Sequence, residues 1–140
     1  MNPLKKAFCR VYQFCFHLAL PVLPYREPKI LKRVNEIPAE IKKLNLKKAL
    51  IITDEFLKKS GATEEMELSL HGGNLEYILY DGTRPNPTVE NVEEALKLYN
   101  NQKCECLIAF GGGSAMDCAK AVGARVVYPK RNLDKFLFFG

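Results

Sequence analysis

Short apolar runs alternate along most of the chain with stretches in which apolar residues recur every three or four positions. The continuous runs are typical of buried strands, and the three-and-four spacing is typical of amphipathic helices. Strands are predicted at residues 49–53, 76–80 and 106–110. Helices are predicted at residues 37–44, 89–101 and 115–124, with further helical segments on either side of Ser60 and Gly61, the second of them capped by Thr63. This alternation predicts βαβ units and a three-layer α/β fold, a parallel sheet with flanking helices.

Residues 1–27 carry a different pattern and are predicted to form an amphipathic helical extension ahead of an α/β domain at residues 28–140. The apolar stripe of this helix comprises Leu4, Ala7, Phe8, Val11, Tyr12, Cys15, Leu18 and Ala19. The uninterrupted apolar run is too short for a bilayer, so no membrane span is expected. The pattern leaves open whether the stripe lies on its own domain, on a partner subunit or on a membrane surface.

Composition narrows the class of protein. The chain has 140 residues, of which 47% are hydrophobic and 26% charged, as in ordinary soluble domains, so disorder and fibrous repeats are excluded. The net charge is +5, but the excess of lysine and arginine lies in the first third of the chain. A nucleic-acid partner is therefore not expected, since such binding calls for a basic surface across the domain.

The cysteines and histidines predict neither a disulfide framework nor a metal site. The cysteine count of 5 is odd, no CxxC spacing occurs, and there are only 2 histidines. Cys104 and Cys106 are two residues apart, so they are expected on the same face of a strand as core residues. Unpaired cysteines of this kind are typical of the reducing cytoplasm, which is the predicted location.

The run Gly111-Gly112-Gly113-Ser114 is the strongest chemical signal in the sequence, because it stands between a predicted strand and a predicted helix. Glycines without Cβ atoms let a ligand approach the backbone closely, and the start of a helix favours a phosphate. Ser114 is predicted to cap this helix together with Asp117. A turn that only lets strand and helix pack remains the alternative.

Three better-known motifs do not fit this run. Met116 occupies the last glycine position of a G-x-G-x-x-G dinucleotide fingerprint. The Lys-Ser or Lys-Thr pair of a P-loop is absent, and so is the closing glycine of a hydrolase nucleophile elbow around Ser114. No residue of the chain is therefore assigned as catalytic.

Two further polar residues are predicted at the same edge of the sheet, where parallel strands bind ligands. Asp54 ends the first strand and could accept hydrogen bonds from ribose hydroxyls, which would favour NAD over NADP, or it could simply cap the next helix. Asn86 stands between two prolines in the loop after the second strand. Turn structure and ligand contact explain Asn86 equally well.

The segment Gly111-Gly-Gly-Ser-Ala-Met-Asp-Cys-Ala-Lys120 resembles the GGGSxxDxAK signature of the iron-containing (group III) alcohol dehydrogenases. Ala49 to Asp54 and Pro85 to Thr88 match the same family in order and approximate spacing, and the resemblance extends from about Pro28 to Pro129. It implies a Rossmann-like domain and an NAD(P)-dependent oxidoreductase acting on alcohols and aldehydes. The cofactor contacts that it implies are Asp54, Asn86, Gly112, Gly113 and Ser114.

The resemblance also defines what this sequence lacks. The family's TTAGTGSE loop and its all-helical domain, whose Asp and three His hold Fe²⁺ or Zn²⁺, have no counterpart here. The expectation is therefore the N-terminal part of a dehydrogenase that is inactive as an isolated fragment, with homo-oligomerisation left open. The alternative is a noncatalytic nucleotide-binding or interaction module from a truncated dehydrogenase gene.

Overall fold

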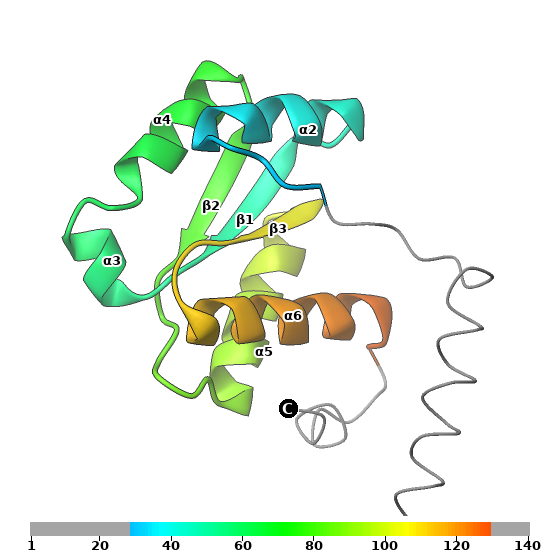
Figure 1. Cartoon of the computed structure of the whole chain (residues 1–140). Coiled ribbons are helices and arrows are strands. Elements are labelled where there is room, and N and C mark those ends of the chain that lie inside the picture. Colours follow the sequence, from blue (N-terminus) through cyan, green and yellow to red (C-terminus); the bar gives the residue numbers. More distant parts are fainter. Residues whose placement is uncertain (1–28, 130–140) are drawn as a thin grey trace, which may run out of the picture. The chain divides into compact units, whose positions relative to one another are not determined.

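The computed structural model describes residues 29–129, and the predicted helix within residues 1–27 lies outside them (Figure 1). Three parallel strands form the sheet in the order β2-β1-β3. They are β1 (Lys48–Ile52), β2 (Glu76–Tyr80) and β3 (Cys106–Ala109). Each strand lies within one residue of its predicted bounds, and the predicted α/β fold with a parallel sheet is confirmed.

The central strand, β1, explains why the first apolar run is uninterrupted. Lys48 to Ile52 pair with Glu76 to Tyr80 of β2, and Ala49 to Ile52 pair with Cys106 to Ala109 of β3. Ala49 is 1% exposed and the next three residues are 0% exposed. After Lys48 at its start, a strand covered on both faces and both edges leaves no exposed position for a charged side chain.

Helices cover both faces of the sheet. They are the 3₁₀ helix η1 (Val34–Glu36), α2 (Ile37–Lys43), α3 (Glu55–Lys59), α4 (Glu64–Gly72), α5 (Val89–Asn101) and α6 (Gly113–Val127). Figure 1 shows α2 and α4 on one face and α5 and α6 on the other. The described part of the chain therefore has the three layers that the sequence predicts.

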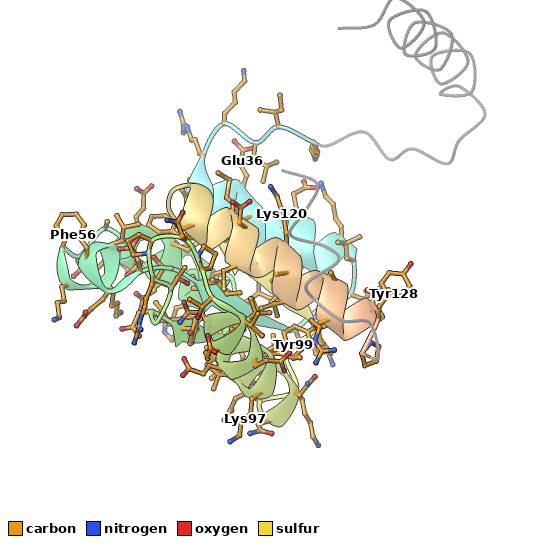
Figure 2. The ribbon with its side chains drawn as sticks, turned by 90° about the horizontal axis from the view of Figure 1, so that it is seen from below. Glu36, Phe56, Lys97, Tyr99, Lys120 and Tyr128 are labelled. Carbon is orange, nitrogen blue, oxygen red and sulfur yellow. The ribbon has the colours of Figure 1, made fainter. Side chains whose placement is uncertain are left out.

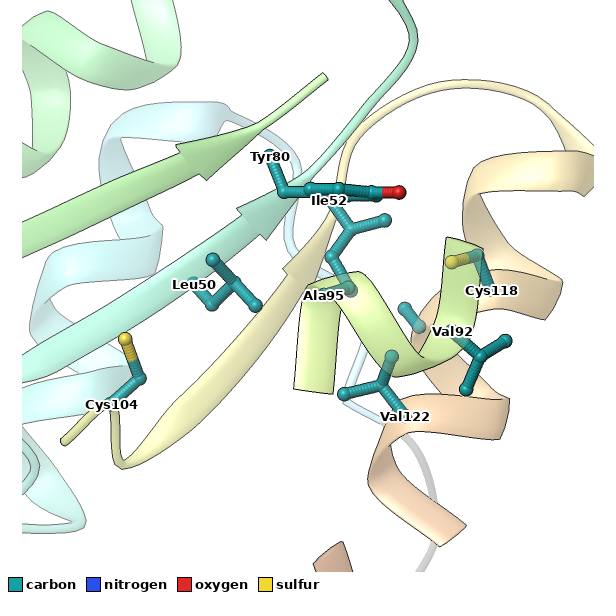
Figure 3. Packing of buried hydrophobic residues seen from close by; sticks show 9 residues of the cluster. Leu50, Ile52, Tyr80, Val92, Ala95, Cys104, Cys118 and Val122 are labelled. Atoms are coloured by element: carbon teal, nitrogen blue, oxygen red, sulfur yellow. The ribbon is translucent and has the colours of Figure 1, made fainter. Parts of the chain in front are cut away.

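Alternating residues of the strands build two separate cores. Leu50, Ile52 and Tyr80 face α5 and α6, where they pack with Val92, Ala95, Cys104, Cys118, Ala119 and Val122 (Figure 3). Ile51 points to the other face and packs with Ile41, Met66, Leu70 and Leu75. Successive strand residues must point to opposite faces, so the single apolar run supplies both cores.

The prediction that Cys104 and Cys106 share a face is wrong. Cys104 packs in the core beneath α5 and α6, whereas Cys106 packs against the opposite core. The reason is that β3 begins only at Cys106, so the two-residue period of a strand does not reach back to Cys104. Both thiols are free, as is that of Cys118.

The side chain of Glu67 on α4 joins three parts of the fold. Its Oε1 accepts hydrogen bonds from Lys58 Nζ of α3 at 2.7 Å and from the Thr63 hydroxyl at 2.6 Å. Its Oε2 accepts one from the Tyr77 hydroxyl of β2 at 3.1 Å. Thr63 stands at the N-cap position of α4 but makes no cap hydrogen bond, so its predicted role as a cap is wrong. Its hydroxyl is used by Glu67 instead.

The strand order places a topological switch point at the carboxyl ends of β1 and β3. The chain passes from β1 through α3 and α4 to β2 on one side, and then through α5 to β3 on the other side of β1. The loops that leave β1 and β3 therefore diverge toward opposite faces. The gap between such loops, at the carboxyl ends of the strands, is where open α/β sheets bind ligands. Within residues 29–129, no helix is long and apolar enough to cross a membrane.

Candidate functional site

The three strand ends meet at one edge of the sheet, as predicted. The Thr53 amide donates to the Tyr80 carbonyl at 2.9 Å, and the Phe110 amide donates to the Ile52 carbonyl at 2.9 Å. An isolated antiparallel bridge pairs Asp54 with Gly82. The hydrogen bonding thus continues past the strands and brings Asp54, the loop after β2 and the glycine loop after β3 to the same place.

The helix after the glycine loop begins two residues earlier than predicted. Gly112, with φ −82° and ψ −164°, occupies the N-cap position of α6, and no side chain caps the helix. Ser114 is therefore inside the first turn, and its predicted cap with Asp117 is wrong. Asp117 pairs instead with Lys120 at 3.3 Å on the exposed face of α6, where Figure 2 labels Lys120. Because Gly112 is extended, the helix can start directly after it.

The start of α6 has the properties of an anion site. The first amide groups of a helix have no partner within the helix, and the helix dipole makes them attractive to a negative charge. No side chain caps these amide groups at the start of α6. A Cβ added to Gly112 or to Gly113 would meet no atom within 4 Å, so both positions face open space. A phosphate can therefore reach this backbone directly.

Gly111 serves the fold rather than a ligand. Its φ of +143° is a conformation that residues with a side chain rarely adopt. A Cβ at this position would lie 3.0 Å from Leu57 Cδ1 and 3.2 Å from Ala115 Cβ. The packing explanation for the glycine run therefore holds at Gly111, but it leaves Gly112 and Gly113 unexplained.

Asp54 combines a structural contact with an oxygen that is directed toward the glycine loop. Its Oδ1 accepts a hydrogen bond from the Leu57 amide at 2.9 Å, so Asp54 is the N-cap of α3. Its Oδ2 lies 3.7 Å from the position that a Cβ of Gly111 would take. Capping thus occupies one oxygen and leaves the other near Gly111.

Asn86 lies in the loop between β2 and α5 with φ +56°, and its side chain is exposed. Asparagine is one of the few residues that adopt this left-handed conformation readily, so the turn itself accounts for its identity. The structure brings Asp54 and Gly111 together, and it places Asn86 in the neighbouring loop. No hydrogen bond joins Asn86 to Asp54 or to the glycine loop within the described residues.

Asn91 organises this edge and was not singled out from the sequence. It is 4% exposed, and its amide nitrogen donates to the Gly82 carbonyl at 3.1 Å. Its side-chain oxygen accepts from the Thr88 amide at 3.3 Å, which completes a capping box at the start of α5. The signal was present as Thr88-x-x-Asn91, a capping box with asparagine in place of the usual Glu or Gln.

A pocket of about 300 Å³ lies beside the loop after β2, and it is lined by Glu55, Asp81, Gly82, Thr83, Arg84, Asn91 and Glu94. Glu94 of this lining accepts a hydrogen bond from the Tyr80 hydroxyl at 3.0 Å. Burial and this hydrogen bond raise the pKa of Tyr80 to about 12, so it stays a neutral phenol. Although carboxylates are numerous here, no three His, Cys, Asp or Glu side chains of residues 29–129 gather closely enough to hold a metal ion.

The thiol near the glycine loop is unsuited to attack a substrate. Cys118 is 0% exposed, and burial raises its pKa, an effect that the Thr83 hydroxyl partly offsets. Burial also raises the pKa of Cys106 to about 11. Because the thiolate is the reactive form, both groups are inert near neutral pH. These two thiols therefore supply no nucleophile to the described site.

The fold and the site together define an open parallel α/β domain with an uncapped, glycine-flanked helix start at its switch point. A family model for iron-containing alcohol dehydrogenases matches residues 31–138 of the chain. The chain belongs to this family.

Individual relatives agree with the family match. The chain is 38% identical to a choline dehydrogenase of Bacillus subtilis over 68% of its own length and 24% of the relative. It is 34% identical to an NAD-dependent methanol dehydrogenase of Bacillus methanolicus, over 64% of its length and 24% of that enzyme. Among solved structures, an NADH-dependent butanol dehydrogenase of Thermotoga maritima matches 76% of the chain with a TM-score of 0.66 and 30% identity, which is 28% of that protein. The chain thus spans about a quarter of the length of these relatives.

Proposed function

We propose that this chain is the N-terminal, NAD-binding part of a metal-dependent alcohol dehydrogenase. The observation that carries the proposal is the backbone of Gly112 and Gly113, which is open to a ligand at the start of an uncapped helix. Nothing in the packing requires glycine at these two positions. A pyrophosphate that approaches the amide groups closely does require it.

The residues at the edge of the sheet contact different parts of the proposed nucleotide. Gly112, Gly113 and Ser114 offer amides and a hydroxyl to the pyrophosphate, Asp54 Oδ2 accepts from the ribose hydroxyls, and Asn86 borders the same edge. When bound, the nicotinamide supplies hydride transfer to or from the carbon of an alcohol or aldehyde. The role of the described residues is to hold and orient that cofactor.

The Fe²⁺ or Zn²⁺ that the family resemblance implies finds no ligand set among residues 29–129. We therefore derive no step of the reaction through a metal from this chain. Alcohols and aldehydes are the proposed substrates of a complete enzyme, since the relatives include a methanol and a butanol dehydrogenase.

Calorimetry of the full 140-residue chain with NAD⁺ and NADH tests the proposal. We expect saturable binding of both nucleotides and no NADH-dependent reduction of an aldehyde. A chain that binds neither nucleotide would overturn the proposal. A noncatalytic nucleotide-binding module would also bind without turnover. The two hypotheses are distinguished by adding the remaining domain of a relative, which should restore turnover only if the chain is the N-terminal part of a dehydrogenase.

Asp54 is the proposed source of a preference for NAD over NADP. Asp54→Asn is expected to lower the ratio of NAD⁺ to NADP⁺ affinity about tenfold, because it removes the charge that repels a 2′-phosphate. Asparagine also caps helices well, so the hydrogen bond to the Leu57 amide can be kept. Glu55→Gln removes the same charge one residue later and serves as the control. An unchanged ratio in Asp54→Asn refutes the assigned role.

We also propose that the division of the chain follows the predicted one, with an extension at residues 1–27 and the nucleotide-binding domain at residues 28–140. Docking of that extension on a second copy would make the protein a homo-oligomer. The cytoplasmic location predicted from the cysteines stays a prediction.

A further inference from the structure

The helix that Asp54 caps, α3, is weakly built. α3 has 5 residues, Glu55–Lys59, and none of its side chains is buried. A helix this short is marginal by itself, so its position depends on contacts with the rest of the fold. The ion pair between Lys59 and Glu55 lies within α3, at 2.5 Å with both side chains at least 70% exposed, and it anchors α3 to nothing else.

Leu57 and Lys58 extend from α3 toward other elements. Leu57 Cδ1 lies 3.0 Å from the position that a Cβ of Gly111 would take, so this side chain borders the glycine loop. Lys58 forms an ion pair with Glu67 on α4, at 2.7 Å between Nζ and Oε1. The Glu67 side chain is 18% exposed, so this pair is shielded from water far better than the pair within α3.

Contacts outside α3 also hold the Glu67 side chain in place. The Thr63 hydroxyl, in a residue that is 0% exposed, and the Tyr77 hydroxyl of β2 both donate to its carboxylate. Burial disfavours its charge, but the hydrogen bonds from Lys58, Thr63 and Tyr77 outweigh burial and lower the pKa of Glu67. Lys58 therefore meets an ionised carboxylate that is fixed to the sheet.

We propose that Glu67 and Lys58 are positioning residues for the nucleotide site. The pair fixes α3 so that Asp54 keeps its cap on the Leu57 amide and its Oδ2 stays beside the glycine loop. Neither residue touches the proposed ligand, and the inference rests on the function proposed above for Asp54. Without the pair, α3 frays and the Asp54 carboxylate no longer has one position.

The test compares Lys58→Met with Lys59→Met in the full chain. Lys58→Met keeps the aliphatic stem and removes the ion pair between α3 and α4, whereas Lys59→Met makes the same change one residue later and removes only a pair within α3. We expect NAD⁺ affinity to fall about fivefold in Lys58→Met and to stay unchanged in Lys59→Met. Lys58→Arg, which retains the ion pair, should restore the affinity. Equal affinities in wild type and Lys58→Met would overturn the inference.

A double-mutant cycle shows whether the effect passes through Asp54. In an Asp54→Ala background, Lys58→Met should cause no further loss of NAD⁺ affinity, since the group that it positions is gone. An additional fivefold loss there would mean that Lys58 acts on stability alone. All affinities are measured at a temperature at which circular dichroism shows each variant folded.

A readout without cofactor separates this inference from the proposed function. In the free chain, hydrogen exchange of the Leu57 amide should speed up in Lys58→Met and remain slow in Lys59→Met. Unchanged exchange in Lys58→Met overturns the positioning role, whatever the cofactor does. If exchange speeds up but the wild-type chain ignores NAD⁺, the tie to α3 stands and the function assigned to Asp54 fails.

Discussion

Gly113→Ala is expected to leave the fold intact and to weaken NAD⁺ binding by at least about tenfold. The added methyl group meets no protein atom within 4 Å, and position 113 is the first residue of α6, where alanine is well tolerated. The same methyl group occupies the space through which a pyrophosphate would reach the backbone. The loss therefore appears in calorimetric titration with NAD⁺ and not in the thermal midpoint.

Gly123→Ala is the matched control because it makes the same change in the interior of the same helix. There a Cβ would lie 3.5 Å from Leu107 Cδ1, an ordinary contact. Replacing a glycine inside a helix stabilises it by up to about 1 kcal/mol, and NAD⁺ affinity should not change. If Gly113→Ala binds NAD⁺ as tightly as Gly123→Ala does, no ligand approaches the backbone at Gly113.

Gly111→Ala is expected to destabilise the chain by about 3 kcal/mol, through backbone strain and overpacking together. The φ of +143° excludes a relaxed alanine, and the new methyl group would press on Leu57 and Ala115. The measurement is the free energy of unfolding from urea titration of the full chain.

Two further variants separate the causes at Gly111. Gly72→Ala places a methyl group in open space at the end of α4 and should leave the free energy of unfolding unchanged or slightly higher. In the Gly111→Ala background, Leu57→Ala should recover the part of the loss that comes from the contact with Leu57. A Gly111→Ala chain as stable as Gly72→Ala would contradict the packing described for this turn.

The fold was predictable because a single physical pattern specifies it. A strand covered on both faces is apolar along its buried length, so Leu50 to Ile52 identify a strand buried on both faces, although its central position in the sheet follows only from the structure. The helix at Val89–Asn101 was predicted with its observed bounds, since it carries a clear apolar stripe.

The errors in the sequence analysis concern where elements begin and which group a capping side chain bonds. The strand β3 begins at Cys106, so Cys104 lies outside its two-residue period. Ser114 and Thr63 are both good caps by residue type, but α6 begins directly after Gly112, and the Thr63 hydroxyl donates to Glu67. The capping-box spacing could have revealed Asn91, but its hydrogen bond to the Gly82 carbonyl forms only once the loop after β2 has folded.

The location of the candidate site was predictable from the sequence, but the role of each residue in it was less so. The carboxyl ends of parallel strands must lie at one edge, so Asp54 and the glycine loop were expected near each other. Which glycine serves packing and which serves a ligand follows only from the surroundings of Gly111, Gly112 and Gly113. From the sequence alone, the three glycines cannot be assigned different roles.

The central position of β1 also has a consequence for how the protein is made. During synthesis, Lys48–Ile52 leaves the ribosome before either of the strands that pair with it. Its apolar side chains, which the folded chain hides almost completely, stay in water until β3 has emerged as well. Parallel pairing between segments far apart in the chain is also slow. The nascent chain therefore exposes the apolar residues of β1 until both partner strands are available, so β1 is a segment to which a chaperone would be expected to bind.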